Sequence, residues 1–458
     1  MKSRFVDLPS VDVQVDAGQV TGPFEWWRHT IGHGGINSRP LPERVIQGAR
    51  KLKPRLVRTF LQEYLHIYPE HGVFDWSLMD PYVESLAATG AKIVAAITFK
   101  PKPLFPDIDE KIYRPNNIEK WQQVITALVQ RYSVERPLIT YWEIGNETDL
   151  GEIGGSPFLI NTADSYFEYY KTMVDAILKV YPTAKVGGPA LAGAQHELLP
   201  GFIARCIETK TQLDFVSWHH YGDPVEAHVS RIKYIRDLLA EHYSGKMPEI
   251  LVTEWNKFFD AVSVEEIAFE SSRAAHTAAT ILDMMDADLD WSFYYHVWDQ
   301  TAYISDFSKF FTDPSIMTIH WNGIPHRFGL FGGNEEVRPQ YFVYEMLTKM
   351  GEEQLASEYD HPALRVRAVR KDKQISVLIV NHQAEATEDL IATLNFAKLP
   401  QGRKQLITYR IDNSRQWDSE ELTLLPVENR EVDTYPDFRC QISSPAETVT
   451  LFTLEMID

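Results

Sequence analysis

The segment LITYWEIGNETDL (138–150) begins as an apolar run and ends in the polar sequence Gly-Asn-Glu-Thr-Asp. Short apolar runs of this kind recur along the first 300 residues. They occupy 27–35, 55–60, 92–99, 138–146, 184–190, 214–221, 249–256 and 291–298. Continuous apolar runs bounded by turn residues are typical of parallel strands that are buried on both faces.

The intervals between these runs are long enough for crossover helices, which parallel strands require. One example is TADSYFEYYKTMVDAILKVYP (162–182), in which apolar residues recur at helical spacing. Eight strand and helix units predict a fold of the α/β class, a (β/α)₈ TIM barrel over residues 17–350. The segment RPQYFVYEMLTKMG (338–351) would be its last helix.

The pattern changes after residue 350. Alternating or strand-like runs at 364–369, 375–381, 406–411 and 448–456 are separated by polar and Pro/Gly turns. This pattern predicts a C-terminal β-sandwich domain of antiparallel strands over 351–458. The N-terminal segment 1–16 contains the alternating run VDVQVD (11–16), and we expect this strand to join the sandwich.

The composition limits the classes of partner that the protein can bind. The 458 residues carry a formal net charge of −19 and contain no basic run, which argues against a nucleic-acid partner. No stretch is long and apolar enough for a membrane span, and the N-terminus lacks an export signal, so we expect a cytoplasmic protein without a membrane partner. Only Cys206 and Cys440 are present, without metal-ligand spacing, so neither a disulfide framework nor a zinc site is indicated.

Two glutamates follow apolar runs at the ends where TIM barrels place reactive groups. Glu147 follows the fourth run and Glu254 ends the seventh, and these strands face each other across a barrel mouth. A lone glutamate at a strand end is more often a cap or an ion-pair partner. Two opposed carboxylates are what cleavage of a glycosidic bond requires, one as an acid and one as a nucleophile or base. Their spacing would distinguish retention (about 5–5.5 Å) from inversion (about 6.5–9.5 Å).

Other polar and aromatic side chains at strand ends are candidates for substrate contact. His219 and Tyr221 share a face of the sixth strand, whereas His220 points the other way, so the His pair cannot easily chelate one metal ion. A buried core histidine is the alternative for each. The candidates for substrate binding are Asn146, His219, Tyr221, His33, Trp255, Tyr295 and Trp298, with Trp321 as a further aromatic. Glu143 lies deeper in the barrel and is interpreted as a structural carboxylate paired with Arg58.

These segments give the sequence a family resemblance. GHGG (32–35), RLVRTF (55–60), VGGPALAG (186–193), LDFVSWHHYG (213–222) and ILVTEWN (250–256), with the Asn146-Glu147 pair, resemble glycoside hydrolase family 39, which includes β-xylosidases and α-L-iduronidases. The resemblance covers roughly residues 15–350. It implies a retaining mechanism with Glu147 as acid/base and Glu254 as nucleophile, Asn146 bonded to the sugar 2-hydroxyl, and His219 and Tyr221 near the nucleophile.

One motif departs from the family. The acid/base segment usually reads Trp-Asn-Glu-Pro, whereas here it reads Gly145-Asn146-Glu147-Thr148. The expected function is that of a retaining exo-glycosidase acting on an oligosaccharide or glycoside, β-xylosidase-like. The alternatives are an α-L-arabinosidase, another exo- or endo-glycosidase of the same clan, and a non-catalytic carbohydrate-binding barrel. A metal-dependent hydrolase is disfavoured by the strand geometry above.

The reaction expected for this family needs no cofactor and no metal. Long loops at 99–117 and 299–325 could wall off one end of the cleft and favour exo action. The mixed-charge surface permits a homo-oligomer without requiring one.

Overall fold

Eight parallel strands close into a barrel in the computed structural model, which describes residues 8–34, 36–222, 224–257, 271–323, 329–383, 387–413 and 421–457. Around the barrel the strands are β2 (His29–His33), β3 (Leu56–Leu61), β4 (Lys92–Ile97), β5 (Ile139–Ile144), β6 (Lys185–Leu191), β7 (Phe215–Tyr221), β8 (Glu249–Asn256) and β9 (Trp291–Tyr295). Each strand overlaps a predicted apolar run, so the predicted TIM barrel is confirmed. The last strand ends at Tyr295 rather than at residue 298.

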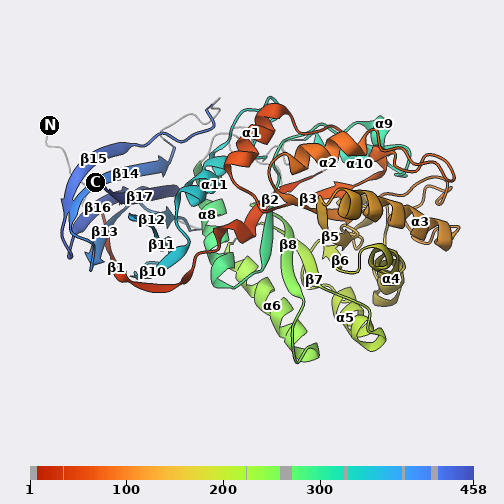
Figure 1. Cartoon of the computed structure of the whole chain (residues 1–458), viewed down its shortest axis with the longest axis horizontal. Coiled ribbons are helices and arrows are strands. Elements are labelled where there is room, and N and C mark those ends of the chain that lie inside the picture. The colour runs from red at the N-terminus through yellow and green to blue at the C-terminus, as the bar shows by residue number, and fades with distance from the viewer. Residues whose placement is uncertain are drawn as a thin grey trace.

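Helices follow the strands and cover the outside of the barrel (Figure 1). They are α1 (Glu43–Lys51), α2 (Met79–Ala87), α3 (Ile118–Val129), α4 (Ala163–Val180), α5 (Leu198–Thr209), α6 (Glu226–His242), α8 (Ser271–Asp286) and α11 (Pro339–Lys349). The sequence sets some of their starts, because the side chains of Asn117 and Thr162 accept hydrogen bonds from backbone N–H groups in the first turns of α3 and α4. Two short helices, α9 (Ile304–Phe307) and α10 (Ser315–Trp321), interrupt the segment between β9 and α11.

The floor of the barrel is an apolar layer. Side chains from six strands pack there, namely Leu56, Val94, Tyr141, Phe215, Leu251 and Phe293. Above this layer the inward positions become polar, with Arg58 on β3 and Glu143 on β5 both fully buried. The barrel is therefore filled from below, and only its C-terminal mouth remains available for a site.

A second sheet holds the rest of the described chain. Its strand order is β15 (Glu428–Thr434), β14 (Gly402–Ile411), β17 (Thr448–Met456), β12 (Gln374–Asn381), β11 (Leu364–Lys371), β10 (Glu353–Glu358), β1 (Ser10–Pro23), β13 (Leu390–Ala397) and β16 (Arg439–Ser444). The sheet curls so that β16 lies against β12 and β17, and a separate apolar core fills the space between. The predicted second β domain is thus one curled sheet that packs on itself.

The N-terminal strand β1 lies inside this sheet. It pairs with β10 on one side and β13 on the other, and its residues alternate between buried and exposed as VDVQVD predicts. The strand is longer than the predicted run, since it continues to Pro23. The pairing with β13 is parallel, which differs from the expected antiparallel arrangement, because a strand from the other end of the chain can enter a sheet in either direction.

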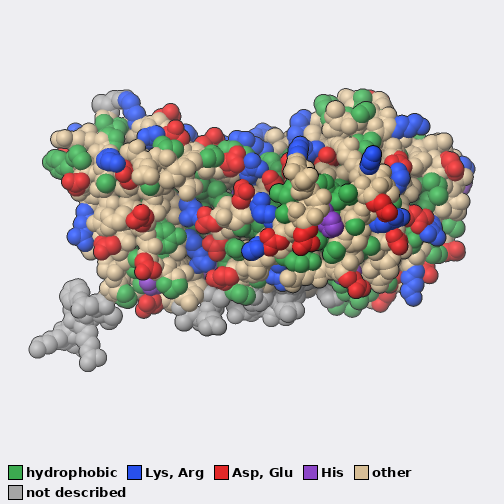
Figure 2. All heavy atoms as spheres, turned by 90° about the horizontal axis from the view of Figure 1, so that it is seen from below, with side chains coloured by type: hydrophobic (Ala, Val, Ile, Leu, Met, Phe, Trp, Pro, Cys, Tyr) green, Lys and Arg blue, Asp and Glu red, His purple; other side chains and the backbone are tan. Residues whose placement is uncertain are grey.

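The two parts of the molecule share an interface. Helix α8 packs against β12, β14 and β17, and Arg365 of β11 forms ion pairs with Asp283 of α8 and Glu226 of α6. On the face shown in Figure 2, acidic and basic side chains are interspersed along both parts. Among the helices that the structure describes, none combines the length and the apolar composition that a membrane crossing requires.

Candidate active site

A cavity of about 360 Å³ opens at the C-terminal mouth of the barrel. Its size lies within the range of small-molecule sites. Polar side chains at strand ends form one part of its wall, and residues from the segments after β2, β5, β6 and β9 and from α6 form most of the rest. The lining residues are Ile36, Phe60, Gln62, Asn146, Glu147, Leu150, Ile153, Gly154, Gly155, Ala192, Gly193, His220, Tyr221, Arg231, Glu254, Tyr295, Phe307, Met317 and Trp321.

A sharp turn after β5 presents Glu147 to this cavity. Gly145 has a φ of 92°, a conformation that glycine adopts without steric cost. This explains why a glycine precedes the Asn146-Glu147 pair in this sequence. Glu147 itself has a φ of 40°, which is strained for a residue with a side chain. Its N–H donates to the carbonyl oxygen of Ala190 at 2.8 Å, so a bond to the neighbouring strand holds the strained turn.

Glu254 points into the barrel from β8 and accepts a hydrogen bond on each carboxylate oxygen. Arg58 Nη1 donates to Oε1 at 2.5 Å, and the Tyr221 hydroxyl donates to Oε2 at 2.5 Å. Both donors favour the ionised carboxylate. These two hydrogen bonds fix the orientation of the Glu254 carboxylate and stabilise its ionised form.

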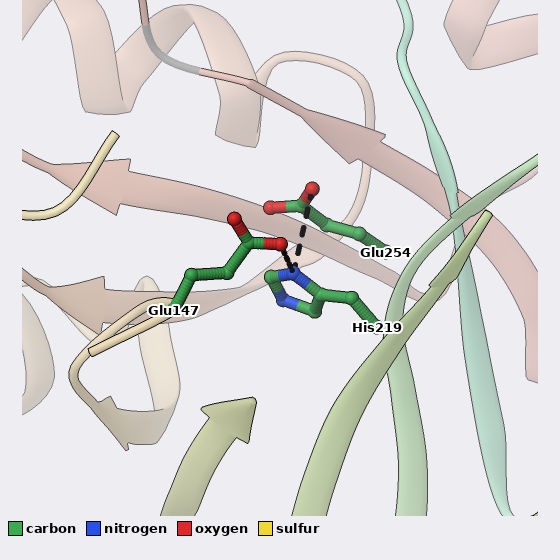
Figure 3. A group of neighbouring side chains, drawn as sticks. All are labelled: Glu147, His219 and Glu254. Atoms are coloured by element: carbon green, nitrogen blue, oxygen red, sulfur yellow. Dashed lines mark hydrogen bonds and ion pairs between the residues drawn. The ribbon is translucent and has the colours of Figure 1, made fainter. Parts of the chain in front are cut away.

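His219 lies between the two glutamates (Figure 3). Its Nδ1 is 2.7 Å from Glu147 Oε1 and 3.7 Å from Glu254 Oε2. In the β7–β8 register His219 is the partner of Glu254, so the sheet itself places these two residues side by side. One oxygen of Glu147, one oxygen of Glu254 and a ring nitrogen of His219 all lie within 4.8 Å of one another. The two carboxylates thus approach each other closely enough to act on one bond.

Arg58 connects the two strands that carry the glutamates. Its Nε donates to Glu143 at 2.7 Å, its Nη1 to Glu254, and its Nη2 to Asn146 Oδ1 at 2.7 Å. The predicted Arg58–Glu143 pair is confirmed. The links to Glu254 and Asn146 were not predicted, since nothing in the sequence shows that one guanidinium reaches residues of both β5 and β8.

The two glutamates have different electrostatic surroundings. Burial raises the pKa of Glu147 well above its usual range, and the charges of Glu254 and Asp149 add to this effect. Burial also raises the pKa of Glu254, but Arg58 and the Tyr221 hydroxyl oppose the rise. The surroundings therefore favour a proton on Glu147 over one on Glu254.

His219 is neutral in this environment. Burial lowers its pKa well below the usual range, and the charge of Arg58 acts in the same direction. Two arrangements satisfy the 2.7 Å contact: Nδ1–H donates to an ionised Glu147, or a protonated Glu147 donates to Nδ1. His219 can thus remain hydrogen-bonded to Glu147 whether the glutamate is ionised or protonated.

The trio Glu147, His219 and Glu254 also has the spacing of a metal site. Within the described part of the chain, it is the one group of three His, Cys, Asp or Glu side chains that is this compact. Both oxygens of Glu254 already accept hydrogen bonds, and the buried Arg58 charge beside them would repel a cation. The electrostatics suit acid/base chemistry better than metal binding.

The remaining predicted residues lie in different places. Asn146, Tyr221, Tyr295 and Trp321 line the cavity, whereas His33, Trp255 and Trp298 are buried and do not. Trp255 follows the inward Glu254 and therefore points to the opposite face of β8, where its ring packs edge-on against Tyr294. Direct substrate contact through Trp255 was a wrong prediction, because the strand alternation used for His219 and His220 applies here too.

His33 does not line the cavity but is the register partner of Thr59 and faces helix α2. Its ring packs 5.9 Å from that of Tyr82, and burial lowers its pKa to about 3. Sequence analysis missed Gln62, which lies just after β3, lines the cavity and donates to Gly155 O at 2.8 Å. Its position directly after an apolar run was the signal that would have identified it, as it did for Asn146 and Glu147.

Arg58 offers a test of the buried charge network. In Arg58→Met, Glu143 and Glu254 lose their shared cation while both stay buried. We expect the free energy of unfolding, measured by urea denaturation, to fall by about 3–5 kcal/mol. Adding Glu143→Gln removes one uncompensated charge and should restore part of the loss. A single variant as stable as the wild type would contradict the network.

Gly154 offers a test of how precisely Glu147 is held. A Cβ at Gly154 would lie 2.5 Å from Glu147 Oε2 and 2.8 Å from Glu147 Cβ. We expect Gly154→Ala to displace the carboxyl and lower kcat by about tenfold to 10²-fold. Gly193→Ala is the matched control, because Gly193 also lines the cavity and its Cβ would meet no atom within 4 Å. Equal kcat values for both variants would show that Glu147 tolerates displacement.

Comparison with known sequences assigns the family. Residues 11–419 match the sequence profile of glycosyl hydrolases family 39. The chain belongs to this family. The resemblance predicted from the sequence is confirmed, and the family is one of glycoside hydrolases. The match begins in β1 and extends through most of the curled sheet, so it covers more than the barrel.

Individual members of the family are distant from this one. A β-xylosidase of Caldicellulosiruptor saccharolyticus is 24% identical over 68% of this chain and 64% of its own length. A β-xylosidase of Geobacillus stearothermophilus is 23% identical over 80% of this chain and 75% of its own length. The crystal structure of a monomeric β-xylosidase from Caulobacter crescentus superposes with a TM-score of 0.77 at 19% identity, covering 98% of this chain and 100% of that one.

Proposed function

We propose that this family 39 protein is a retaining, exo-acting glycosidase with the specificity of a β-xylosidase. The observation that carries the proposal is the pair of carboxylates at the barrel mouth, with oxygens within 4.8 Å of each other and with cationic and hydroxyl donors on Glu254 alone. The asymmetry gives the two residues different roles, which double displacement requires.

In the first step a carboxylate oxygen of Glu254 attacks the anomeric carbon. The glycosidic C–O bond breaks, and the proton of Glu147 goes to the departing oxygen, so that the aglycone leaves as a neutral alcohol. The product is a glycosyl ester on Glu254 and an ionised Glu147. Before the attack, the negative charge of Glu254 disfavours ionisation of Glu147. Formation of the ester removes the charge of Glu254, and Glu147 can then lose its proton to the departing oxygen.

In the second step Glu147 accepts a proton from water, the water oxygen bonds to the anomeric carbon, and the ester bond to Glu254 breaks. Two inversions give net retention. His219 stays bonded to Glu147 and orients it in both steps. Asn146 is fixed through Oδ1 by Arg58, while its Nδ2 makes only a long 3.4 Å contact with Gly154 O, so this amide can donate to a sugar hydroxyl.

Exo action and the choice of sugar rest on weaker support. The segment 299–325 contributes Phe307, Met317 and Trp321 to the cavity wall, whereas no residue of 99–117 lines it. The wall on that side favours a pocket over an open groove. β-Xylosidase specificity is supported by the names of two curated relatives, and an α-L-arabinosidase is the second candidate because the Gly-Asn-Glu-Thr motif departs from the usual family sequence.

The test is hydrolysis of 4-nitrophenyl glycosides by the purified chain, with the first-formed sugar anomer identified by proton NMR. The panel contains the β-xyloside, α-L-arabinoside, β-glucoside, β-galactoside and α-L-iduronide. We expect cleavage of the β-xyloside with the β-anomer released first. Initial release of the α-anomer would exclude double displacement. Digestion of xylotetraose separates the modes of action, because an exo-enzyme releases xylose from the start.

A further inference from the structure

The wall of the cavity is divided by polarity. Most of its polar side chains come from the ends of β3, β5, β7 and β8. The loop after β5 and the segment of α9 and α10 contribute almost only apolar side chains, namely Leu150, Ile153, Phe307, Met317 and Trp321, which we call the apolar wall.

Two residues of the apolar wall are exposed although they line the cavity. Leu150 is 42% exposed and Ile153 is 70% exposed. Both belong to the short loop that carries Glu147, Ile153 within the 3₁₀ turn η4 (Gly151–Gly154). Aliphatic side chains beside a ligand cavity are in contact with water. Covering them with an apolar group of the ligand removes that contact and makes binding more favourable.

The loop is fixed rather than free to fold its aliphatic side chains inward. The Glu152 carboxylate accepts hydrogen bonds from the backbone N–H groups of Thr312 and Asp313 and from the Thr312 hydroxyl. The N–H of Glu152 in turn donates to Glu110 Oε2 at 2.8 Å. The buried Glu152 thus anchors η4 to the segment before α10, and its neighbour Ile153 lines the cavity while remaining exposed.

The apolar wall lies on the leaving-group side of the site. An acid that protonates the glycosidic oxygen must be next to the group attached to that oxygen. Glu147 is in close contact with this loop, because the N–H of Leu150 donates to the Glu147 carbonyl oxygen and a Cβ on Gly154 would touch the Glu147 carboxyl. The group that leaves therefore rests near Leu150 and Ile153.

A second sugar at this position would find few partners. The carbonyl oxygen of Gly155 already accepts a hydrogen bond from Gln62. The side chains of the apolar wall offer aliphatic and aromatic surface, and a sugar residue needs partners for its hydroxyls when it leaves water. His220 and Arg231, which could supply such partners, come from β7 and α6 instead.

We propose that the natural substrates are glycosides of an apolar alcohol or phenol, with the aglycone seated on Leu150, Ile153 and Met317, and not oligosaccharides. This inference rests on the proposed glycosidase function and narrows its substrate class. The sugar occupies the polar part of the cavity next to Glu254, and the apolar aglycone displaces water from the apolar wall.

The test compares ethyl and octyl β-D-xyloside, whose leaving alcohols differ little in acidity. We expect kcat/KM for the octyl glycoside to exceed that for the ethyl glycoside by at least about tenfold. The double variant Leu150→Ser with Ile153→Ser should lose most of this ratio. Ile319→Ser is the matched control, since Ile319 is also 70% exposed but lies on α10 without lining the cavity, and it should keep the full ratio.

Each outcome decides between the two proposals. Equal kcat/KM values for the ethyl and octyl glycosides, or a ratio that the double variant leaves unchanged, would overturn the apolar aglycone while leaving the glycosidase function intact. If the nitrophenyl panel identifies another sugar, the same alkyl pair is made with that sugar. Failure to cleave any glycoside of the panel or xylotetraose overturns the proposed function itself, and the inference with it.

Discussion

Glu254→Ala should lose essentially all hydrolysis of 4-nitrophenyl β-D-xyloside, with kcat lower by about 10⁴-fold or more. In the proposed mechanism this carboxylate attacks the anomeric carbon, and Tyr221 and Arg58 hold both of its oxygens. No neighbouring side chain can replace it, because Glu147 is occupied as the acid and Glu143 is paired with Arg58 below.

Two variants separate chemistry from folding. Glu254→Gln keeps the size of the side chain and an oxygen for one donor, and it should be as inactive as Glu254→Ala. Glu249→Gln alters a carboxylate at the other end of the same strand, where Glu249 contacts Lys185 and Tyr141, and it should retain activity. Substantial activity in folded Glu254→Ala would show that Glu254 is not the nucleophile.

Glu147→Ala should lower kcat/KM by about 10²- to 10⁴-fold for a phenyl β-xyloside, whose leaving group needs a proton. The loss should be much smaller for a dinitrophenyl β-xyloside, because that leaving group departs without one. Added azide should restore turnover and yield the β-xylosyl azide, since it attacks the ester on Glu254 from the face that Glu147 has vacated. Azide with Glu254→Ala should instead give the α-azide.

The pH profile provides an independent check on Glu147. Its pKa is raised by burial and by the Glu254 charge, and the acid must be protonated to act, so wild-type kcat/KM should fall as pH rises through this raised pKa. Glu147→Ala should lack this basic limb. The acidic limb, which reflects ionisation of Glu254, should remain. A basic limb that persists in Glu147→Ala would assign the acid to another residue.

The two glutamates that meet at the barrel mouth could be predicted from the sequence for a simple reason. A parallel strand buried on both faces is a continuous apolar run, so a Glu directly after such a run marks the C-terminal mouth of the barrel. This reasoning located Glu147 and Glu254 and, through inward parity, His219 and Tyr221. Applied to every strand, the position after an apolar run also identifies Gln62. Strand alternation excludes Trp255, which follows the inward Glu254.

Other features lay outside any local pattern. Nothing near Arg58 in the sequence indicates that one guanidinium contacts Glu143, Glu254 and Asn146, because these lie 85, 196 and 88 residues away along the chain. His219 was expected beside Glu254, but its shorter contact is with Glu147. The apolar wall likewise arises from two loops that meet only in the folded chain.

The sequence by itself determined the barrel, the residues at its mouth and the family. The spacing of apolar residues, the ends of strands and short motifs are all local properties of the chain. The tertiary structure alone decided the close approach of the two carboxylates, the hydrogen-bond donors that Arg58 and Tyr221 give to Glu254, and the apolar surface beside Glu147. These depend on distances between residues that are remote in the chain, and such distances are fixed only when strands, loops and buried charges pack together.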